Sequence, residues 1–155
     1  MLLSDLLSLE RIRCHVHSSS KKRLLETISR ELARNSDVLS EREIFESLCA
    51  RERLGSTGLG NGVAIPHGRV KGSQDIEATF ICLKKPIPFD AVDGEPVDLL
   101  FAMAVPENCN EDHLNLLAQV AELFSDPDLL KKLREAESPG KLLQLLSSSR
   151  HSTRH

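Results

Sequence analysis

Residues 97–105 are almost wholly apolar, and the run from Leu99 to Val105 contains no polar side chain. Sequences of this kind are typical of a strand at the centre of a sheet whose two faces are both covered. Pro106 follows directly, and because proline has no backbone N–H it ends such a strand. We therefore predict a central strand here, with other parts of the chain packed on both sides of it.

Shorter patterns predict the other strands. Residues 12–16 alternate between apolar and polar side chains, a period of two that indicates a half-buried strand. Short apolar runs predict strands over 63–65 and 78–83. Residues 84–90 contain two prolines, so we expect an irregular connection or a sheet edge there. Asp93-Gly94 is a turn signal that leads into the central strand.

Helices are predicted where apolar residues recur every three or four positions. One is expected over 21–35 after an N-cap serine, and another after the capping box of Ser40 and Glu43, ending at Gly55. A short helix or turn is expected over 2–7. Further helices should follow Asn110, Ser125-Asp126-Pro127 and Ser138-Pro139. The inner stripe of the helix after Asn110 is expected to contain Leu114, Leu117, Val120, Ala121 and Phe124.

Helices and strands therefore alternate, and at least one strand pair is joined by a short turn. This order predicts an α/β (α+β) fold, a single three-layer sandwich in which a mixed β-sheet is flanked by helices on both faces. The 155 residues fit one domain.

Composition excludes several classes of function. A formal net charge of −3 argues against a nucleic-acid partner, whose binding surface requires basic residues. No apolar run approaches the length of a membrane span, and the first residues do not resemble a signal peptide. The four cysteines form no C-x-x-C pair and suit reduced thiols. We expect a cytoplasmic protein that does not insert into membranes.

The segment from Gly55 to Gly68 carries the most specific chemistry. It contains four glycines within eight residues, then the apolar run at 63–65, and then Pro66-His67-Gly68. Glycines let backbone N–H groups approach an anion closely. Pro66 ends the strand ladder, so we expect His67 to be displayed at a strand end, with Gly68 leaving room beside it. His67 is therefore a candidate phosphate carrier.

Residue pattern alone leaves other interpretations open. A histidine after a strand is often structural or merely exposed. The glycine spacing matches neither the Walker pattern nor the dinucleotide fingerprint, because no Gly-Lys-Ser/Thr follows and residue 65 is isoleucine. The pattern by itself thus indicates an anion-binding loop beside a histidine.

Arg51 and His113 are the two other candidates from local pattern. Arg51 lies in the last turn of its predicted helix and leads into the glycine segment, although a cation there also suits the helix dipole alone. His113 lies in the first turn of its helix, where it could donate to a phosphate, although a surface position is common for such a residue.

The cluster of Cys14, His15 and His17 is the one candidate for a metal. Regular alternation along a strand would place Cys14 on the face opposite both histidines, so the three could not converge. We therefore predict no metal site.

Several segments together resemble a known family. The segment 55–68 resembles the phosphorylation-site signature of the fructose/mannitol-type (type 2) enzyme IIA domains of the bacterial phosphotransferase system, and Arg51-Glu52-Arg53-Leu54 is similar to the family's Arg-Glu segment. The segments 88–101 and 105–106, followed by Asp112-His113-Leu114, occur in the family's order. The resemblance covers roughly residues 1–147 and is greatest to the nitrogen-regulatory branch.

The resemblance implies a domain over 1–147 and a polar tail over 148–155 that we expect to be disordered. It implies that His67 is phosphorylated on Nε2 (tele-phosphohistidine) and that His113 and Arg51 assist catalytically. Backbone groups of a phosphate-binding loop would help them. This loop is expected to contain Gly58, Gly60, Asn61, Gly62 and Gly68.

The resemblance further implies a phosphocarrier and phosphorylation-dependent regulator without a cofactor. Its donor would be a histidine phosphocarrier protein of the NPr/HPr type, and its targets would be regulated proteins such as transporters or sensor kinases. Two alternatives remain: a sugar-specific IIA component that passes phosphate to a IIB domain, and a binding module that only senses an anion. The oligomeric state stays open.

Overall fold

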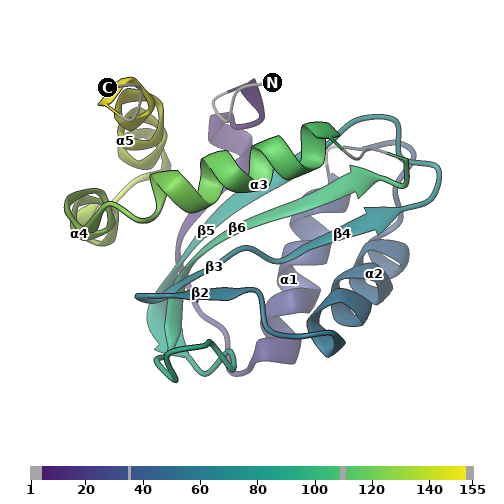
Figure 1. Ribbon diagram of the computed structural model, residues 1–155, viewed down its shortest axis with the longest axis horizontal. Coiled ribbons are helices and arrows are strands. Elements are labelled where there is room, and N and C mark those ends of the chain that lie inside the picture. The colour runs from purple at the N-terminus through teal and green to yellow at the C-terminus, as the bar shows by residue number, and fades with distance from the viewer. Residues whose placement is uncertain (1–4, 35, 109–110, 153–155) are drawn as a thin grey trace.

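The computed structural model describes residues 5–34, 36–108 and 111–152 (Figure 1). A 3-10 helix, η2 (Leu9–Arg11), precedes the strands and helices. In chain order these are β1 (Ile12–Val16), α1 (Lys21–Arg34), α2 (Glu41–Arg53), β2 (Gly58–Gly60), β3 (Val63–Ala64), β4 (His67–Val70), β5 (Glu77–Ile87), β6 (Val97–Pro106), α3 (Glu111–Leu123), α4 (Pro127–Glu135) and α5 (Pro139–Ser152).

The six strands form one mixed sheet in the order β1-β5-β6-β3-β2, and β4 also pairs with β6. β5 and β6 are antiparallel, whereas β3 and β4 run parallel to β6, and β1 runs parallel to β5. The predicted central strand is confirmed, because β6 has neighbours on both edges and its residues Leu99–Val105 are all buried. The predicted mixed sheet is confirmed as well.

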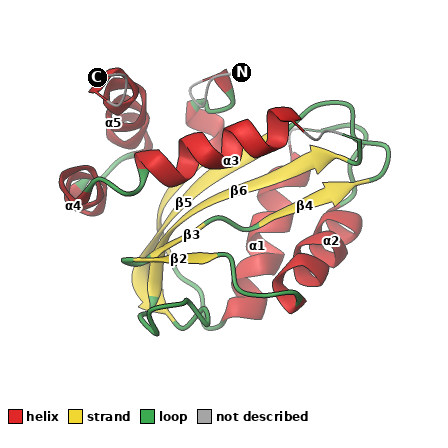
Figure 2. Ribbon diagram, viewed as in Figure 1, coloured by secondary structure: helices red, strands yellow, loops and turns green. Residues whose placement is uncertain are grey.

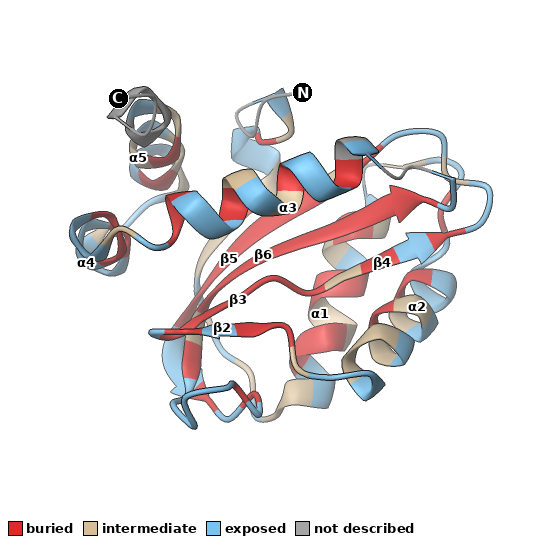
Figure 3. Cartoon of the chain, in the orientation of Figure 1, coloured by how far each residue is buried: buried red, intermediate tan, exposed pale blue. Residues whose placement is uncertain are grey.

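Helices cover both faces of this sheet (Figures 1 and 2). Alternate residues of β6 point to opposite sides: Phe101 and Met103 join a core cluster with residues of α3, α4 and α5. Leu100 and Ala102 join a second cluster with residues of α1 and α2. Figure 3 shows the consequence, since the sheet is buried while the outward faces of the helices are exposed. The predicted three-layer sandwich is therefore the observed one.

The helix starts follow the predicted caps. The Ser20 hydroxyl accepts from the backbone N–H of Arg23 at the start of α1, and Ser40 accepts from the N–H of Glu43 at the start of α2. Asp126 caps α4, with Pro127 at its first position. Asn110, the expected cap of α3, lies outside the described residues, as do residues 2–4 of the predicted N-terminal helix.

Three local expectations differ from the structure. β5 continues as a strand through Pro86 to Ile87, where an irregular connection or a sheet edge was expected; the register shifts between Cys82 and Ile87, so Pro86 lies outside the regular ladder and its missing N–H breaks no bond. On α3, Leu114 is 63% exposed, and Leu116 takes its place in the core. Helix α5 runs past residue 148, where we expected a tail to begin.

The predicted alternation along β1 is interrupted at His15, whose φ is +55°. The register against β5 shifts between Arg13 and Val16, as expected for a bulge. Cys14 therefore packs on the α3 side of the sheet, whereas Val16 packs on the α1–α2 side. The regular alternation used to separate Cys14 from the two histidines does not hold. Among the residues that the structure describes, no three or more His, Cys, Asp or Glu side chains gather as metal ligands would.

Candidate functional site

His67 is the first residue of β4. β3 and β4 both pair in parallel with β6, and the two residues between them, Ile65 and Pro66, interrupt the pairing. The Pro66 nitrogen cannot donate, but its carbonyl accepts from the N–H of Met103 at 2.9 Å, so the ladder resumes at His67. The proline thus creates a break in an otherwise continuous strand, and His67 follows that break.

The break turns the Ile65 carbonyl toward the His67 ring. Nδ1 of His67 lies 2.7 Å from this oxygen. A carbonyl can only accept, so Nδ1 carries the proton and Nε2 keeps its lone pair. Burial lowers the pKa of His67 and outweighs the bond to Ile65, which raises it; Arg51 lowers the pKa further and Glu52 raises it. The ring is therefore neutral at pH 7, with Nε2 as its nucleophilic atom.

His113 reaches the same place from the first turn of α3. Its ring stands edge-on to that of His67, with the ring centroids 5.3 Å apart and the planes at 69°. Only 5% of His113 is exposed, and neither ring nitrogen has a hydrogen-bond partner in the described structure. Burial, then the charges of His67 and Arg69, lower its pKa to about 4. The surface interpretation of His113 is wrong, because its helix turns this residue toward the sheet.

Arg51 and Gly58 line one pocket with His67. The pocket is also lined by Ser56, Thr57, Leu59, Ile65, Leu117 and Ala121. Arg51 leaves the last turn of α2, and its Nη1 donates to the carbonyl of Gly55 at 2.8 Å. The Gly58 N–H is already used, since it donates to the Ser56 hydroxyl at 3.0 Å. Arg51 therefore lines the pocket together with His67, whereas His113 is not among the lining residues and approaches His67 through the edge-on contact of the two rings.

Gly60, Asn61 and Gly62 directly follow Leu59, which lines the His67 pocket, but none of the three lines that pocket. Asn61 and Gly62 have φ values of +59° and +81° and form the turn between β2 and β3. Positive φ at both positions is the requirement of a type I′ hairpin turn, for which Asn-Gly is favoured. Their pocket is lined by residues that include Asp93, Asp98 and Arg134, and none of its lining residues lines the His67 pocket. The structure does not bring the three residues together with His67.

Gly68 serves helix packing. A Cβ at this position would collide with the Ser47 hydroxyl and come within 3.1 Å of the Ser47 backbone. The Ser47 hydroxyl donates to the carbonyl of Arg69 at 2.7 Å, which joins α2 to β4. The space beside Gly68 is thus filled by α2, where we expected room for the His67 ring.

Sequence reasoning missed several residues that shape the pocket. Ser56 and Thr57 lie in the glycine segment, and their side chains hold it: Ser56 donates to the carbonyl of Phe89 at 2.7 Å, and Thr57 contacts Glu52. Leu117 lies four residues after His113 on α3, so helical spacing alone would have indicated a shared face. The Asn61-Gly62 pair was a turn signal within the glycine-rich sequence.

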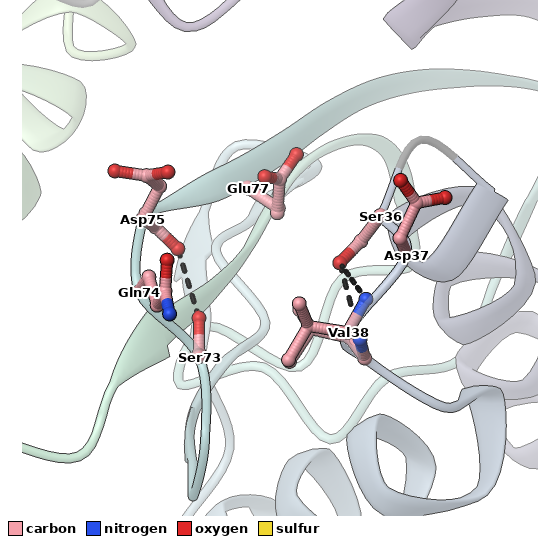
Figure 4. Close-up of a pocket in the computed structure, with 8 residues that line it drawn as sticks. Ser36, Asp37, Val38, Ser73, Gln74, Asp75 and Glu77 are labelled. Atoms are coloured by element: carbon pink, nitrogen blue, oxygen red, sulfur yellow. Dashed lines mark hydrogen bonds between the residues drawn. The ribbon is translucent and has the colours of Figure 1, made fainter.

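A second pocket lies away from these residues, near the start of β5 (Figure 4). Its carboxylates come from Asp37, Asp75 and Glu77, and none of the predicted site residues lines it. Glu77 is paired with Arg11 at 2.7 Å. The Ser73 hydroxyl donates to the carbonyl of Asp75 at 2.9 Å, as drawn in Figure 4. The first contact joins η2 to β5, and the second stabilises the loop before β5.

Comparison with known proteins identifies the class. Residues 5–149 match the family model of the phosphoenolpyruvate-dependent sugar phosphotransferase system, EIIA 2. The chain belongs to this family and is a IIA component of type 2, so the resemblance seen in the sequence is confirmed.

Two curated relatives and one solved structure point to a branch within the family. The chain is 43% identical over 148 residues to a nitrogen regulatory protein of Klebsiella oxytoca, covering 95% of this chain and 91% of the relative. It is 44% identical over 144 residues to that of Pseudomonas aeruginosa, covering 93% and 94%. Nitrogen Regulatory Protein IIA-Ntr from Neisseria meningitidis superposes with a TM-score of 0.89 at 42% identity, covering 94% of this chain and 99% of the other.

Members of this family are components of a phosphotransferase system. In the part of the chain that the structure describes, every helix is too short or too polar to cross a membrane.

Proposed function

We propose that this protein is a phosphocarrier and phosphorylation-dependent regulator of the nitrogen-branch phosphotransferase system. It accepts a phosphoryl group on Nε2 of His67 from a histidine phosphocarrier protein of the NPr/HPr type, and the phosphorylation state controls partner proteins in the cytoplasm, such as transporters or sensor kinases. The observation that carries the proposal is the hydrogen bond from Nδ1 of His67 to the Ile65 carbonyl, which leaves Nε2 as the free nucleophile.

Transfer of the phosphoryl group to His67 depends mainly on correct positioning of the reacting atoms and on groups that stabilise negative charge. Nε2 attacks in line, so the bond between Nε2 and phosphorus forms while the bond between phosphorus and the donor's ring nitrogen breaks, and the donor ring leaves with the electron pair. The Nδ1 proton stays on the hydrogen bond to Ile65. Negative charge develops on the three equatorial oxygens of the phosphoryl group, and hydrogen-bond donors in the pocket are needed to stabilise it.

Arg51 and His113 supply these donors. Arg51 would exchange its bond to the Gly55 carbonyl for a forked contact with two phosphoryl oxygens. His113 is neutral because its pKa is about 4, so one of its two unpaired nitrogens carries a proton that it can donate. Phosphorylation then adds close to two negative charges to a half-buried pocket, a change that a partner protein can read.

The relatives favour regulation over sugar uptake, since the two compared above are named nitrogen regulatory proteins and each aligns over nearly its whole length. The alternative is a sugar-specific IIA component that passes the phosphoryl group to a IIB domain. Phosphorylated protein mixed with a fructose- or mannitol-specific IIB domain separates the two: rapid transfer supports the alternative.

The direct test uses phosphoenolpyruvate, enzyme I and a phosphocarrier protein of the nitrogen branch, with intact mass as the readout. Wild type should gain one phosphoryl group that is lost in acid, and His67→Ala should gain none. His17→Ala, which removes an exposed histidine, is the matched control and should behave as wild type. No gain by wild type with an active donor would leave only anion sensing, and a gain by His67→Ala would mean that another histidine is the acceptor.

A further inference from the structure

Glu52, one residue after Arg51, has a buried carboxylate at the end of α2. Its side chain is only 6% exposed. The carboxylate accepts from Thr57 twice, from the backbone N–H at 3.2 Å and from the hydroxyl. Lys21 completes the set, with Nζ 3.0 Å from Oε1. A buried carboxylate is costly unless it is paired and hydrogen-bonded, and these three contacts satisfy both conditions.

Thr57 connects this carboxylate to His67 through one further residue. The Thr57 carbonyl accepts from the N–H of Ile65 at 3.0 Å, and the Ile65 carbonyl lies 2.7 Å from Nδ1 of His67. Both linking residues are buried, with 6% and 4% exposure. A continuous series of hydrogen bonds therefore runs from Glu52 through Thr57 and Ile65 to the His67 ring.

The position of the Ile65 carbonyl depends on this series. Ile65 lies in the break between β3 and β4, where pairing with β6 is interrupted. Because Pro66 follows and has no N–H, the sheet holds this point less firmly than a continuous strand would. The bond from the Ile65 N–H to Thr57 supplies the missing support, and Glu52 fixes Thr57 in turn.

We propose that Glu52 is a positioning residue for phosphorylation of His67. It anchors Thr57 and, through Ile65, holds the carbonyl that keeps the proton on Nδ1 and leaves Nε2 open to the pocket. This inference rests on the proposed function, in which Nε2 is the acceptor atom.

The charge of Glu52 contributes as well as its geometry. The charged groups that act on the pKa of His67 are Arg51 and Glu52 from the end of α2, and the titratable ring of His113 faces it from α3. Arg51 lowers the pKa of His67, and Glu52 raises it. Glu52 therefore keeps Nε2 more basic, and a more basic nitrogen is the better nucleophile as long as it stays unprotonated.

The test compares Glu52→Gln with wild type. Glutamine keeps the shape and one acceptor for Thr57 but removes the charge, and Lys21 keeps Asp90 as a partner at 3.6 Å. Glu46→Gln is the matched control, because Glu46 lies on the same helix, is 64% exposed and pairs only with Arg42 among the described contacts. Thr57→Val is the second variant, since it removes only the hydroxyl and keeps the backbone bonds to Glu52 and Ile65.

Two readouts separate positioning from general stability. Nitrogen-15 NMR of the His67 ring reports which nitrogen carries the proton and the pKa of the ring, without any phosphodonor. Kinetics of phosphorylation by the phosphocarrier protein give kcat, KM for the donor, and the pH at which the rate falls on the acidic side. Thermal unfolding confirms that each variant is folded.

For Glu52→Gln we expect kcat to fall by about tenfold with a smaller change in KM, as for other residues that orient a reacting histidine. The acidic limb of the rate profile should move to lower pH, and a larger share of His67 should carry its proton on Nε2. Thr57→Val should change the same three quantities in the same direction but by less. If Glu52→Gln does not fold, the measurements on Thr57→Val decide the test.

The inference would be overturned if a folded Glu52→Gln protein kept the His67 tautomer, the acidic limb of the rate profile and kcat of wild type. It would also be overturned if Glu46→Gln showed equal effects. The NMR readout keeps this result independent of the proposed function: if wild type accepts no phosphoryl group, the proposed function fails, whereas the tautomer still decides whether Glu52 positions the ring.

Discussion

The ring of His113 stands edge-on to the ring of His67, with the two centroids 5.3 Å apart, although β5 and β6 lie between the two residues in the chain. His67 comes from β4 and His113 from the first turn of α3, so the start of α3 lies against the start of β4. Neither ring nitrogen of His113 has a hydrogen-bond partner among the residues that the structure describes, and a buried group left unsatisfied costs about 1–3 kcal/mol. Binding of a phosphoryl group on His67 would remove that cost.

Replacing His113 should therefore slow phosphorylation more than it harms folding. Because the ring supplies a donor that is fully used only when charge develops on the phosphoryl oxygens, His113→Ala should reduce the rate by about a hundredfold. The measurement is rapid-quench phosphorylation by the phosphocarrier protein. A rate equal to that of wild type would show that His113 makes no contact with the transferred group.

The stability of the protein should fall between pH 7 and pH 5. In the folded state the pKa of His113 is about 4, below its ordinary value of 6.5, so the unfolded chain binds more protons in this range. The contribution is fully present above pH 6.5 and is lost as the pH falls toward 4, by roughly 1–2 kcal/mol at pH 5. Urea unfolding at several pH values measures it. His113→Gln, which cannot be protonated, should show a shallower slope, and an identical slope would contradict this assignment.

The guanidinium of Arg51 should matter for its shape as well as its charge. Lysine keeps the charge but cannot make a forked contact with two oxygens, so Arg51→Lys should still lose about tenfold or more in phosphorylation rate. Arg53→Lys is the control, because Arg53 lies two residues further on, is exposed and does not line the pocket. Equal rates for Arg51→Lys and wild type would mean that a point charge is sufficient.

Gly68→Ala should destabilise the protein by about 1–3 kcal/mol, because the new methyl group meets Ser47 of α2 and overpacks the contact between helix and strand. Thermal unfolding provides the measurement. Gly140→Ala is the control: its nearest neighbours would lie 4.0 Å away, so that change should not destabilise. A combined Gly68→Ala, Ser47→Ala protein should recover part of the loss, since the hydroxyl contact is removed while the backbone contact remains.

Arg134→Ala should loosen the turn between β2 and β3 without slowing phosphorylation. Arg134 donates to the carbonyl of Asn61 at 2.5 Å and to both oxygens of Asp98 at 2.9–3.1 Å. Loss of these charge-assisted bonds should cost about 1–3 kcal/mol of unfolding free energy. The phosphorylation rate of the folded variant should match wild type, because the turn does not line the His67 pocket. A large loss of rate would restore Gly60, Asn61 and Gly62 to the phosphate site.

Much of the architecture followed from local pattern. The apolar run at 97–105 predicted a central strand, and β6 is that strand. Ser40 with Glu43 predicted the start of α2, and the Ser40 hydroxyl caps it. Such features depend on backbone sterics and on neighbours within four residues, so sequence alone specifies them. The position of His67 directly after a proline-broken strand was likewise readable from Ile65-Pro66-His67.

Other features depend on which distant segment packs against a residue. Leu114 was expected in the core and Leu116 was not, because several faces of α3 carry apolar residues and only contact with the sheet selects one of them. The bulge at His15 could not be predicted either, since it arises from the register of β1 against β5.

The sequence by itself determined the sandwich fold and the histidine that follows the break in the strand, because periodicity, caps and proline act locally. The family followed from the resemblance of whole segments to known members. Only the tertiary structure decided what surrounds that histidine. It buried His113 beside His67, filled the space at Gly68 with α2, and placed Asn61-Gly62 in a turn away from the pocket. These outcomes result from parallel pairing and helix packing between segments far apart in the chain, and no local pattern contains that information.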